Sequence, residues 1–164
     1  GALRDATGCV PLIGFESGAS CASEALREGR QITFGKYFLT AWYTPGHTND
    51  SYSLLLTDGD HRCVFSGDTL LIRGTGRTDF QNGGAGEQYD SLRRLFTLPG
   101  DTLVFPAHDY KGWTVSTLAE EQAHNPRLKV ADRAAYIELM GNLNLPNPQL
   151  MDVAVPANLA CGRE

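Results

Sequence analysis

The stretch TPGHTNDSYSLLLTDGDHRCVFSGDT, residues 44–69, decides the fold of this chain. Within it, the apolar runs Ser51–Thr57 and Arg62–Phe65 flank Asp58-Gly59-Asp60, which predicts two strands joined by a hairpin turn. The triplet Leu54–Leu56 shows no polar alternation, so we expect this strand to be buried on both faces. A short polar motif lies at the end of each run, where a sheet holds side chains rigidly enough to build a site.

Outward from the hairpin, short apolar runs alternate with amphipathic ones. Two further strands are expected within Gln31–Tyr43 and one at Thr102–Phe105. Helices are expected at Ser23–Arg30, Glu87–Leu98, Thr117–His124 and Ala131–Met140. Residues 142–156 are rich in Pro and Asn, which favours a segment that wraps the surface. Strands interspersed with helices predict an α/β layered fold in a single domain, residues 1–164.

The composition argues against two classes of partner. A formal net charge of -5 does not suit a nucleic-acid-binding protein, because phosphate binding requires a basic face. No apolar stretch approaches the roughly 20 residues needed to cross a bilayer, so no membrane partner is expected. The cysteines form no C-x-x-C pair and are expected to be free thiols in a reducing compartment. They are Cys9, Cys21, Cys63 and Cys161.

Three polar motifs stand where apolar runs end, and they carry the residue types of a metal site. Their central residues are His47, Asp68 and His108. Imidazole and carboxylate groups are ligands that suit Zn and non-haem Fe(II). Each motif taken alone is more simply a turn or a cap, but three at successive strand ends favour a metal site. His61 is expected to be a solvated turn residue and His124 a helix-end residue.

A glycine-rich loop, Arg73–Gly86, adds candidates for substrate binding. Arg73 and Arg77 could bind a carboxylate bidentately through their guanidinium groups. The structural alternative, which stays open, is that both arginines pair with local acids such as Asp79 or Glu87.

Longer strings make the chain recognisable. Gly67–Gly74 (GDTLLIRG) precedes Gly76–Gln81 (GRTDFQ), and Pro106–Tyr110 has the sequence PAHDY. Together with Asn125–Leu128 and Met140–Pro146, these strings resemble the persulfide dioxygenases, also called sulfur dioxygenases, the ETHE1-like branch of the metallo-β-lactamase superfamily. The Ile-Arg-Gly and Gly-Arg-Thr-Asp-Phe strings separate this branch from ordinary glyoxalase II. One departure is Thr75, which stands where the family typically has Cys.

The resemblance implies a metallo-β-lactamase-type αββα sandwich and a mononuclear Fe(II) enzyme, with Zn as the alternative metal. The implied reaction oxidises glutathione persulfide with O₂ and water to sulfite and glutathione, in sulfide catabolism. By family pattern His47 and Asp68 would be two of three iron ligands, with His108 hydrogen-bonding behind them. The implied catalytic residues are His108 and Tyr110, and the implied substrate-binding residues are Arg73, Arg77, Asp79 and Tyr110.

The superfamily's His-x-His-x-Asp-His motif, which supplies the third iron ligand, does not occur in this sequence and is expected upstream of Gly1. The chain therefore resembles the C-terminal two-thirds of a persulfide dioxygenase, N-terminally truncated, and we expect it to be inactive alone. The expected partner is a complementing N-terminal segment or a second copy in a homo-oligomer. Two alternatives stay open: a glyoxalase II-like hydroxyacylglutathione thioester hydrolase with a binuclear centre, and a non-catalytic remnant. The resemblance implies the cytoplasm in bacteria and the mitochondrial matrix in eukaryotes.

Overall fold

The computed structural model describes residues 2–19, 23–79, 82–146 and 149–160. The chain forms two compact units, one made of Gly1–Leu26 with Asn144–Glu164 and the other of Arg27–Leu143. All the candidate site residues lie in the second unit. The expectation of a single domain over residues 1–164 stays a prediction.

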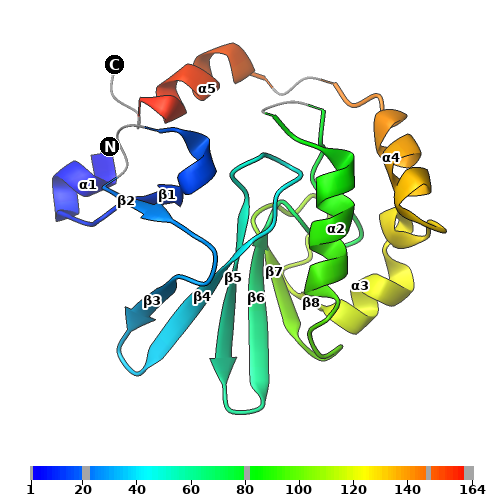
Figure 1. Ribbon diagram of the computed structural model, residues 1–164, viewed down its shortest axis with the longest axis horizontal. Helices are drawn as coiled ribbons and strands as arrows, with labels where there is room; N and C mark the ends of the chain where they lie inside the picture. Colours follow the sequence, from blue (N-terminus) through cyan, green and yellow to red (C-terminus); the bar gives the residue numbers. More distant parts are fainter. Residues whose placement is uncertain (1, 20–22, 80–81, 147–148, 161–164) are drawn as a thin grey trace. The chain divides into compact units, whose positions relative to one another are not determined.

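The second unit is built on a mixed six-stranded sheet (Figure 1). In sheet order the strands are β3 (Gln31–Phe34), β4 (Tyr37–Tyr43), β5 (Tyr52–Asp58), β6 (His61–Gly67), β7 (Leu103–Pro106) and β8 (Ser116–Thr117). All neighbours pair antiparallel except β6 and β7, which run parallel. The hairpin predicted around Asp58-Gly59-Asp60 is confirmed as β5–β6, with Leu54 opposite Phe65. The expected strands within Gln31–Tyr43 and at Thr102–Phe105 are confirmed as well.

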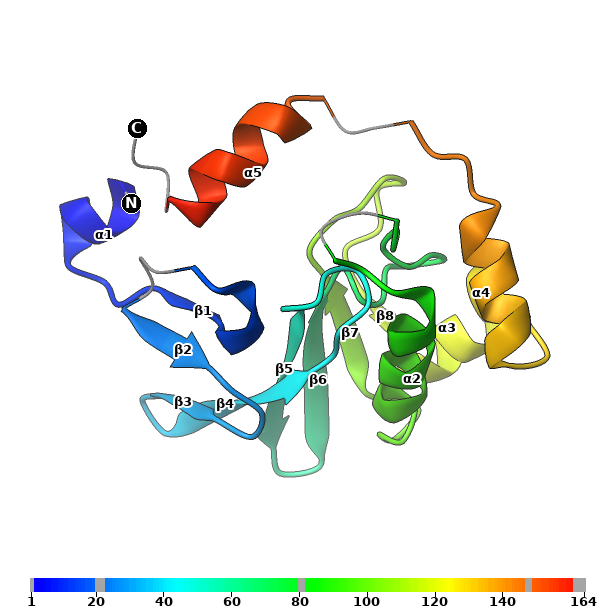
Figure 2. The ribbon, with the colours of Figure 1, turned by 45° about the horizontal axis from the view of Figure 1, so that its top comes forward.

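The described residues of this unit also form three α-helices, labelled in Figure 2, and one 3-10 helix. They are α2 (Ala85–Leu95), α3 (Leu118–His124), η2 (Pro126–Leu128) and α4 (Arg133–Gly141). Three of the starts are set by side-chain caps, since Thr117 accepts from the Glu120 amide, Asn125 from the Arg127 amide and Asp132 from the Ala135 amide. The helices expected at Glu87–Leu98, Thr117–His124 and Ala131–Met140 are therefore confirmed, with ends shifted by a few residues.

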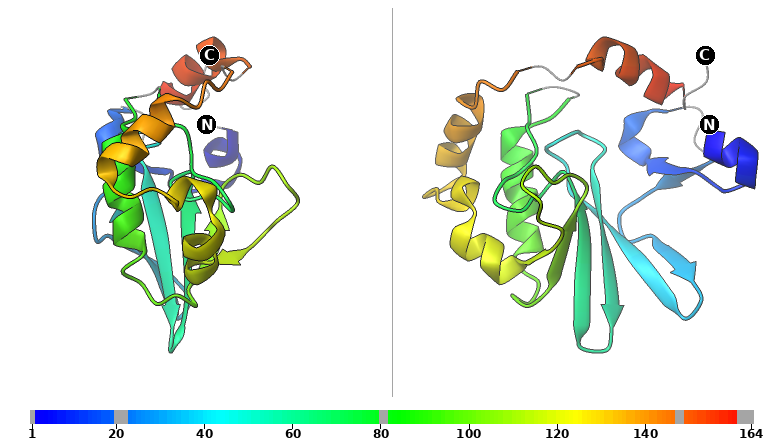
Figure 3. Two further views of the ribbon diagram at one scale, coloured as in Figure 1. Left: turned by 90° about the vertical axis from the view of Figure 1, so that its right-hand side faces the viewer. Right: turned by 180° about the vertical axis from the view of Figure 1, so that it is seen from behind.

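The core lies between one face of the sheet and these helices. Val64 of β6 and Val104 of β7 lie opposite each other on this face and pack against side chains of α2, α3 and α4. The buried core members are Val64, Leu70, Leu92, Leu95, Val104, Leu118, Tyr136 and Met140. Figure 3 (left) shows α2 along one side of the strands, while the segment between β7 and β8 extends away on the other.

The prediction that Leu54–Leu56 are buried on both faces is wrong, because all three residues are only half-buried. On the sheet face opposite the core, Leu54 lies beside Phe65, which is 41% exposed. The run of three leucines therefore reflects one core face and one partly open apolar face.

The first unit contains α1 (Ala2–Thr7), β1 (Leu12–Gly14), η1 (Phe15–Ser17), β2 (Glu24–Leu26) and α5 (Met151–Leu159). The helix expected at Ser23–Arg30 is wrong, because Glu24–Leu26 pairs in parallel with Leu12–Gly14. Pairing with a strand from elsewhere in the chain overrides local propensity here. The described side chains of residues 142–156 are exposed or half-buried, as expected of a surface segment, and α5 begins within this segment. Among the described residues, no helix combines the length and hydropathy needed to span a membrane.

Candidate metal centre

Two loops carry the candidate ligands His47 and Asp68, and buried hydroxyl groups tie these loops together. The loop after β4 begins at Thr44, whose hydroxyl lies 2.9 Å from that of Ser53. Thr69, next to Asp68, donates its hydroxyl to the Thr44 carbonyl at 3.1 Å. These three side chains are buried, so their hydrogen bonds hold the two loops in a fixed relative position.

The imidazole of His47 is oriented by a backbone carbonyl. Its Nδ1 lies 2.8 Å from the carbonyl oxygen of Arg77. A carbonyl oxygen only accepts, so Nδ1 carries the proton and the lone pair of the neutral ring lies on Nε2. Metal-binding histidines are held in this way, with one nitrogen bonded to the protein and the other directed at the ion.

Asp68 divides its two carboxylate oxygens between two histidines. Oδ1 accepts a hydrogen bond from His108 Nδ1 at 2.6 Å, and Oδ2 lies 3.5 Å from His47 Nε2. Ligand atoms about 2.1 Å from one ion lie roughly 3 to 3.5 Å apart, so Oδ2 and Nε2 can bind the same metal ion. The side chains of His47 and Asp68 are 22% and 18% exposed, which leaves the pair accessible.

The described residues bring together two candidate metal ligands, His47 and Asp68. No group of three His, Cys, Asp or Glu side chains is close enough to hold an ion in that part of the chain. His108 stands behind Asp68, with its side chain 57% exposed and its ring stacked on that of Tyr110 at 6.2 Å. This is the position expected for a residue that orients a metal ligand.

Gly76 lies in close contact with both Asp68 and His47. A Cβ atom at this position would lie 2.4 Å from the Asp68 carbonyl oxygen and 2.8 Å from His47 Nδ1. The Gly76 amide donates to that same Asp68 oxygen at 2.7 Å. Both candidate ligands therefore pack on the backbone at Gly76, and any side chain there would displace them.

Residues 28–108 match the profile of a family described as the metallo-beta-lactamase superfamily. The crystal structure of ETHE1 from Myxococcus xanthus has 54% sequence identity to this chain and a TM-score of 0.91. That alignment covers 99% of this chain and 70% of the Myxococcus chain. The chain belongs to the ETHE1 family of the metallo-β-lactamase superfamily. The expected fold is thereby confirmed.

Two curated proteins are also similar in sequence to this chain. The Homo sapiens protein named mitochondrial persulfide dioxygenase ETHE1 is 49% identical over 156 residues, which are 94% of this chain and 60% of the human protein. Hydroxyacylglutathione hydrolase of Neisseria meningitidis is 38% identical over 125 residues, which are 76% of this chain and 48% of that enzyme. The chain thus spans about 60% of the length of the human ETHE1 protein.

In this member of the ETHE1 family, Arg77 forms a bidentate ion pair with Asp79. Arg77 Nε and Nη2 each donate to a carboxylate oxygen at 2.6 Å. The hydrogen bond with Asp79 raises the pKa of Arg77, and the hydrogen bond from Arg77 lowers the pKa of Asp79. The alternative of local acid pairing is confirmed for Arg77. The Asp79 carboxylate is 55% exposed, so the pair remains open to a ligand on its outer side.

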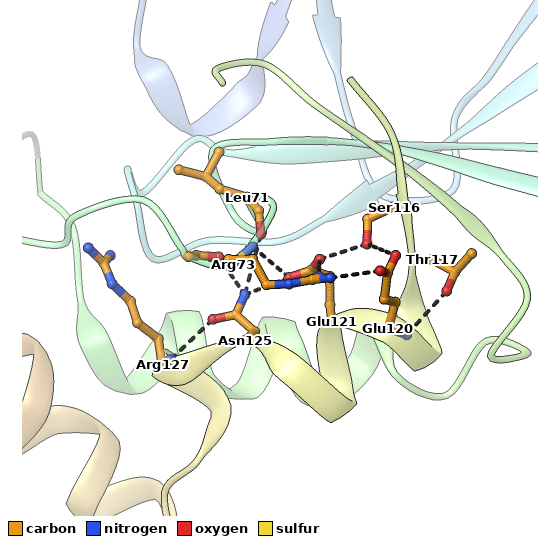
Figure 4. A network of polar contacts seen from close by, with 9 residues as sticks. Leu71, Arg73, Ser116, Thr117, Glu120, Glu121, Asn125 and Arg127 are labelled. Atoms are coloured by element: carbon orange, nitrogen blue, oxygen red, sulfur yellow. Dashed lines mark hydrogen bonds and ion pairs between the residues drawn. The ribbon is translucent and has the colours of Figure 1, made fainter. Parts of the chain in front are cut away.

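Arg73 has a structural role that the sequence analysis did not assign (Figure 4). Its guanidinium group donates to Glu120 at 2.7 Å and to the fully buried Glu121, and its backbone amide donates to Glu121 at 2.8 Å. Asn125 also reaches Glu121, at 2.9 Å, and bonds the carbonyls of Leu71 and Gly74. The Arg73 side chain therefore anchors the loop to α3, and its expected role in substrate binding stays a prediction.

Predictions from the sequence also cover the other histidines, Tyr110 and the cysteines. His61 and His124 are exposed, as expected for a turn residue and a helix-end residue. Tyr110 is 79% exposed beside His108. Cys9 and Cys63 are free thiols, as expected, while Cys21 and Cys161 lie outside the described residues. Sequence reasoning missed Gly76 as a packing position, although its place between the two arginines of a glycine-rich loop was a usable signal.

Proposed function

We propose that this chain is the metal- and glutathione-binding part of a persulfide dioxygenase, which oxidises glutathione persulfide to sulfite and glutathione with O₂ and water. The observation that carries the proposal is the arrangement of Asp68 Oδ2 and His47 Nε2, 3.5 Å apart, in a chain 49% identical to a human persulfide dioxygenase. A third ligand, which the sequence analysis places upstream of Gly1, is part of the proposal.

His47, Asp68 and the third ligand would hold one Fe(II) ion, which would supply the activation of O₂ for oxidation of the persulfide sulfur. Two His and one carboxylate are a donor set that suits non-haem Fe(II). His47 directs Nε2 to the metal because the Arg77 carbonyl holds Nδ1. His108 holds Asp68 Oδ1, which keeps Oδ2 directed toward the same point. The protein's task is then to position its ligands and the substrate.

Glutathione would bind at the outer side of the Arg77–Asp79 pair. Glutathione carries carboxylates and an ammonium group, so a guanidinium and a partly exposed carboxylate offer complementary charges. Arg77 supplies both its side chain for glutathione and its carbonyl for His47. One residue therefore connects substrate binding with ligand orientation. Tyr110, beside His108, is proposed to donate a hydrogen bond to the substrate.

The test uses the natural full-length protein. We expect one iron per site and O₂ uptake with glutathione persulfide, with sulfite as the product. Two zinc ions per site together with no O₂ uptake would contradict the proposal. Loss of iron in Asp68→Ala and in His47→Ala, with retained folding by circular dichroism, would tie the metal to these residues.

A second candidate is hydrolysis of a hydroxyacylglutathione thioester. It is favoured by the 38% identity to the Neisseria hydrolase, and it would use Asp68 to bridge two metal ions with His108 as a ligand. The hydrogen bond from His108 Nδ1 to Asp68 fits the orienting role of His108 in the first candidate, but it leaves His108 Nε2 for a metal ion and so fits the second candidate as well. Hydrolysis of lactoylglutathione by the purified protein would decide for the hydrolase.

The expectations about substrate, partners, oligomeric state and location are also part of the proposal. They are a glutathione-containing substrate, no nucleic-acid or membrane partner, a homo-oligomer or a complementing N-terminal segment, and a mitochondrial or bacterial cytoplasmic location. The human relative carries the word mitochondrial in its name, which supports the matrix for a eukaryotic protein.

A further inference from the structure

Gln88 is a buried polar residue that the proposed function does not use. It lies in α2 with no exposed surface. Its Nε2 donates to the Gly76 carbonyl at 3.1 Å, and its Oε1 accepts from the Tyr136 hydroxyl at 2.7 Å. Burying an amide is unfavourable unless both of its ends are bonded, so these two contacts determine how the side chain lies.

A chain of hydrogen bonds determines the orientation of the Gln88 side-chain amide. The Tyr136 hydroxyl has one proton, which goes to Gln88, so the Thr75 hydroxyl donates to the Tyr136 oxygen at 3.0 Å. Arg127 in turn donates to the Thr75 hydroxyl at 3.2 Å and to the Thr75 carbonyl. Because each step fixes the next, the NH₂ group of Gln88 faces Gly76.

This chain of hydrogen bonds ends next to His47. Gly76 precedes Arg77, whose carbonyl oxygen accepts from His47 Nδ1 at 2.8 Å. On the other side, Gly46 packs directly on α2, since a Cβ atom there would lie 2.3 Å from Gln88 Cα. Gln88 therefore contacts both the residue before His47 and the segment that orients its ring.

We propose that Gln88, locked by Tyr136, is a positioning residue for His47: it holds the Gly76–Arg77 segment so that the Arg77 carbonyl directs His47 Nε2 toward Asp68. The inference rests on the proposed function, because there His47 is a metal ligand. The positioning itself is a property of the protein and is measurable without metal.

The central variant is Gln88→Met, which keeps the size of the side chain and removes both hydrogen bonds. In the metal-free protein, NMR of the imidazole nitrogens reports the tautomer of His47, and a His47→Gln variant assigns its signals among those of four histidines. We expect His47 in the Nδ1–H tautomer in the parent protein and a mixture of tautomers in Gln88→Met. In the full-length protein, Fe(II) should bind about 10- to 100-fold more weakly in this variant. Tyr136→Phe should shift both measurements in the same direction by less.

Leu95→Val is the matched control, because Leu95 lies buried in the same helix but belongs to the apolar core. It should lower the melting temperature while leaving the His47 tautomer and the iron affinity unchanged. An unchanged tautomer and iron affinity in Gln88→Met would overturn the inference. Iron retained in His47→Ala would instead reject the proposed metal site, and the tautomer measurement would still decide the role of Gln88.

Discussion

His108 donates a hydrogen bond from Nδ1 to Asp68 Oδ1 at 2.6 Å, while the other oxygen of Asp68 lies 3.5 Å from His47 Nε2. The carboxylate is therefore held on one side and directed at the candidate metal position on the other. His108 is exposed on the segment between β7 and β8, so its contribution to the site passes through Asp68.

This relationship predicts different losses of metal for the two residues. Asp68→Ala should abolish iron retention, because it removes a proposed ligand. His108→Ala should weaken iron binding by about 10- to 100-fold, the usual effect of removing a group that orients a ligand. Iron content after dialysis against a graded series of chelator concentrations would measure both effects. Equal and complete loss in the two variants would make His108 a ligand, as the hydrolase alternative requires.

Arg77→Ala separates substrate binding from metal binding. His47 is held by the Arg77 backbone carbonyl, which the variant keeps, so iron should be retained. Loss of a hydrogen bond to a charged substrate group is worth about 1.5–3 kcal/mol, which predicts a KM for glutathione persulfide raised roughly 10- to 150-fold. Steady-state O₂ uptake measures this change. Iron loss equal to that of Asp68→Ala would contradict the separation.

Gly76→Ala should damage the site without altering a charge. The added Cβ would meet the Asp68 carbonyl oxygen at 2.4 Å and His47 Nδ1 at 2.8 Å, and such overpacking costs about 1–3 kcal/mol. Urea unfolding and iron content should both report the loss. Gly74→Ala is the matched control in the same loop, since its nearest neighbour would be Leu71 Cβ at 3.9 Å. A similar loss in both variants would show that the loop, and not the contact, is responsible.

Arg73→Met should destabilise the protein through Glu121. This carboxylate has no exposed surface, and losing its partner leaves a buried charge uncompensated at a cost of about 3–5 kcal/mol. Urea unfolding would give the change in the free energy of unfolding. Adding Glu121→Gln should restore much of the loss, whereas Glu120→Gln alone should have little effect because Glu120 is partly exposed. If the Arg73→Met protein were as stable as the parent and had a raised KM, Arg73 would bind substrate instead.

Tyr136 predicts a fall in stability at alkaline pH. Burial raises the pKa of its hydroxyl from 10.0 to about 12. Below pH 10 both the folded and unfolded states keep the proton, so stability is unaffected. Between pH 10 and 12 the unfolded state loses the proton first, and stability falls by up to about 1.4 kcal/mol per pH unit. Urea unfolding at several pH values should show a shallower fall in Tyr136→Phe, and equal slopes would contradict the assignment.

Local sequence patterns were sufficient to predict most of the helices and strands. The hairpin at Asp58-Gly59-Asp60 and the helices with caps at Thr117 and Asp132 depend on residues a few positions apart, and they formed where expected. The prediction at Ser23–Arg30 was wrong because its strand pairs with Leu12–Gly14, a partner that no local window contains.

The sequence by itself determined the family, the strand-end placement of His47, Asp68 and His108, and the chemistry those residue types allow. Only the tertiary structure decided how they are held, because the partners are distant in the chain. The carbonyl that orients His47 is 30 residues away, and the acid that engages Arg73 is 48 residues away. Hydrogen-bond direction and burial follow from such packing, so a motif predicts which groups gather in a site, while the fold determines which atoms they present.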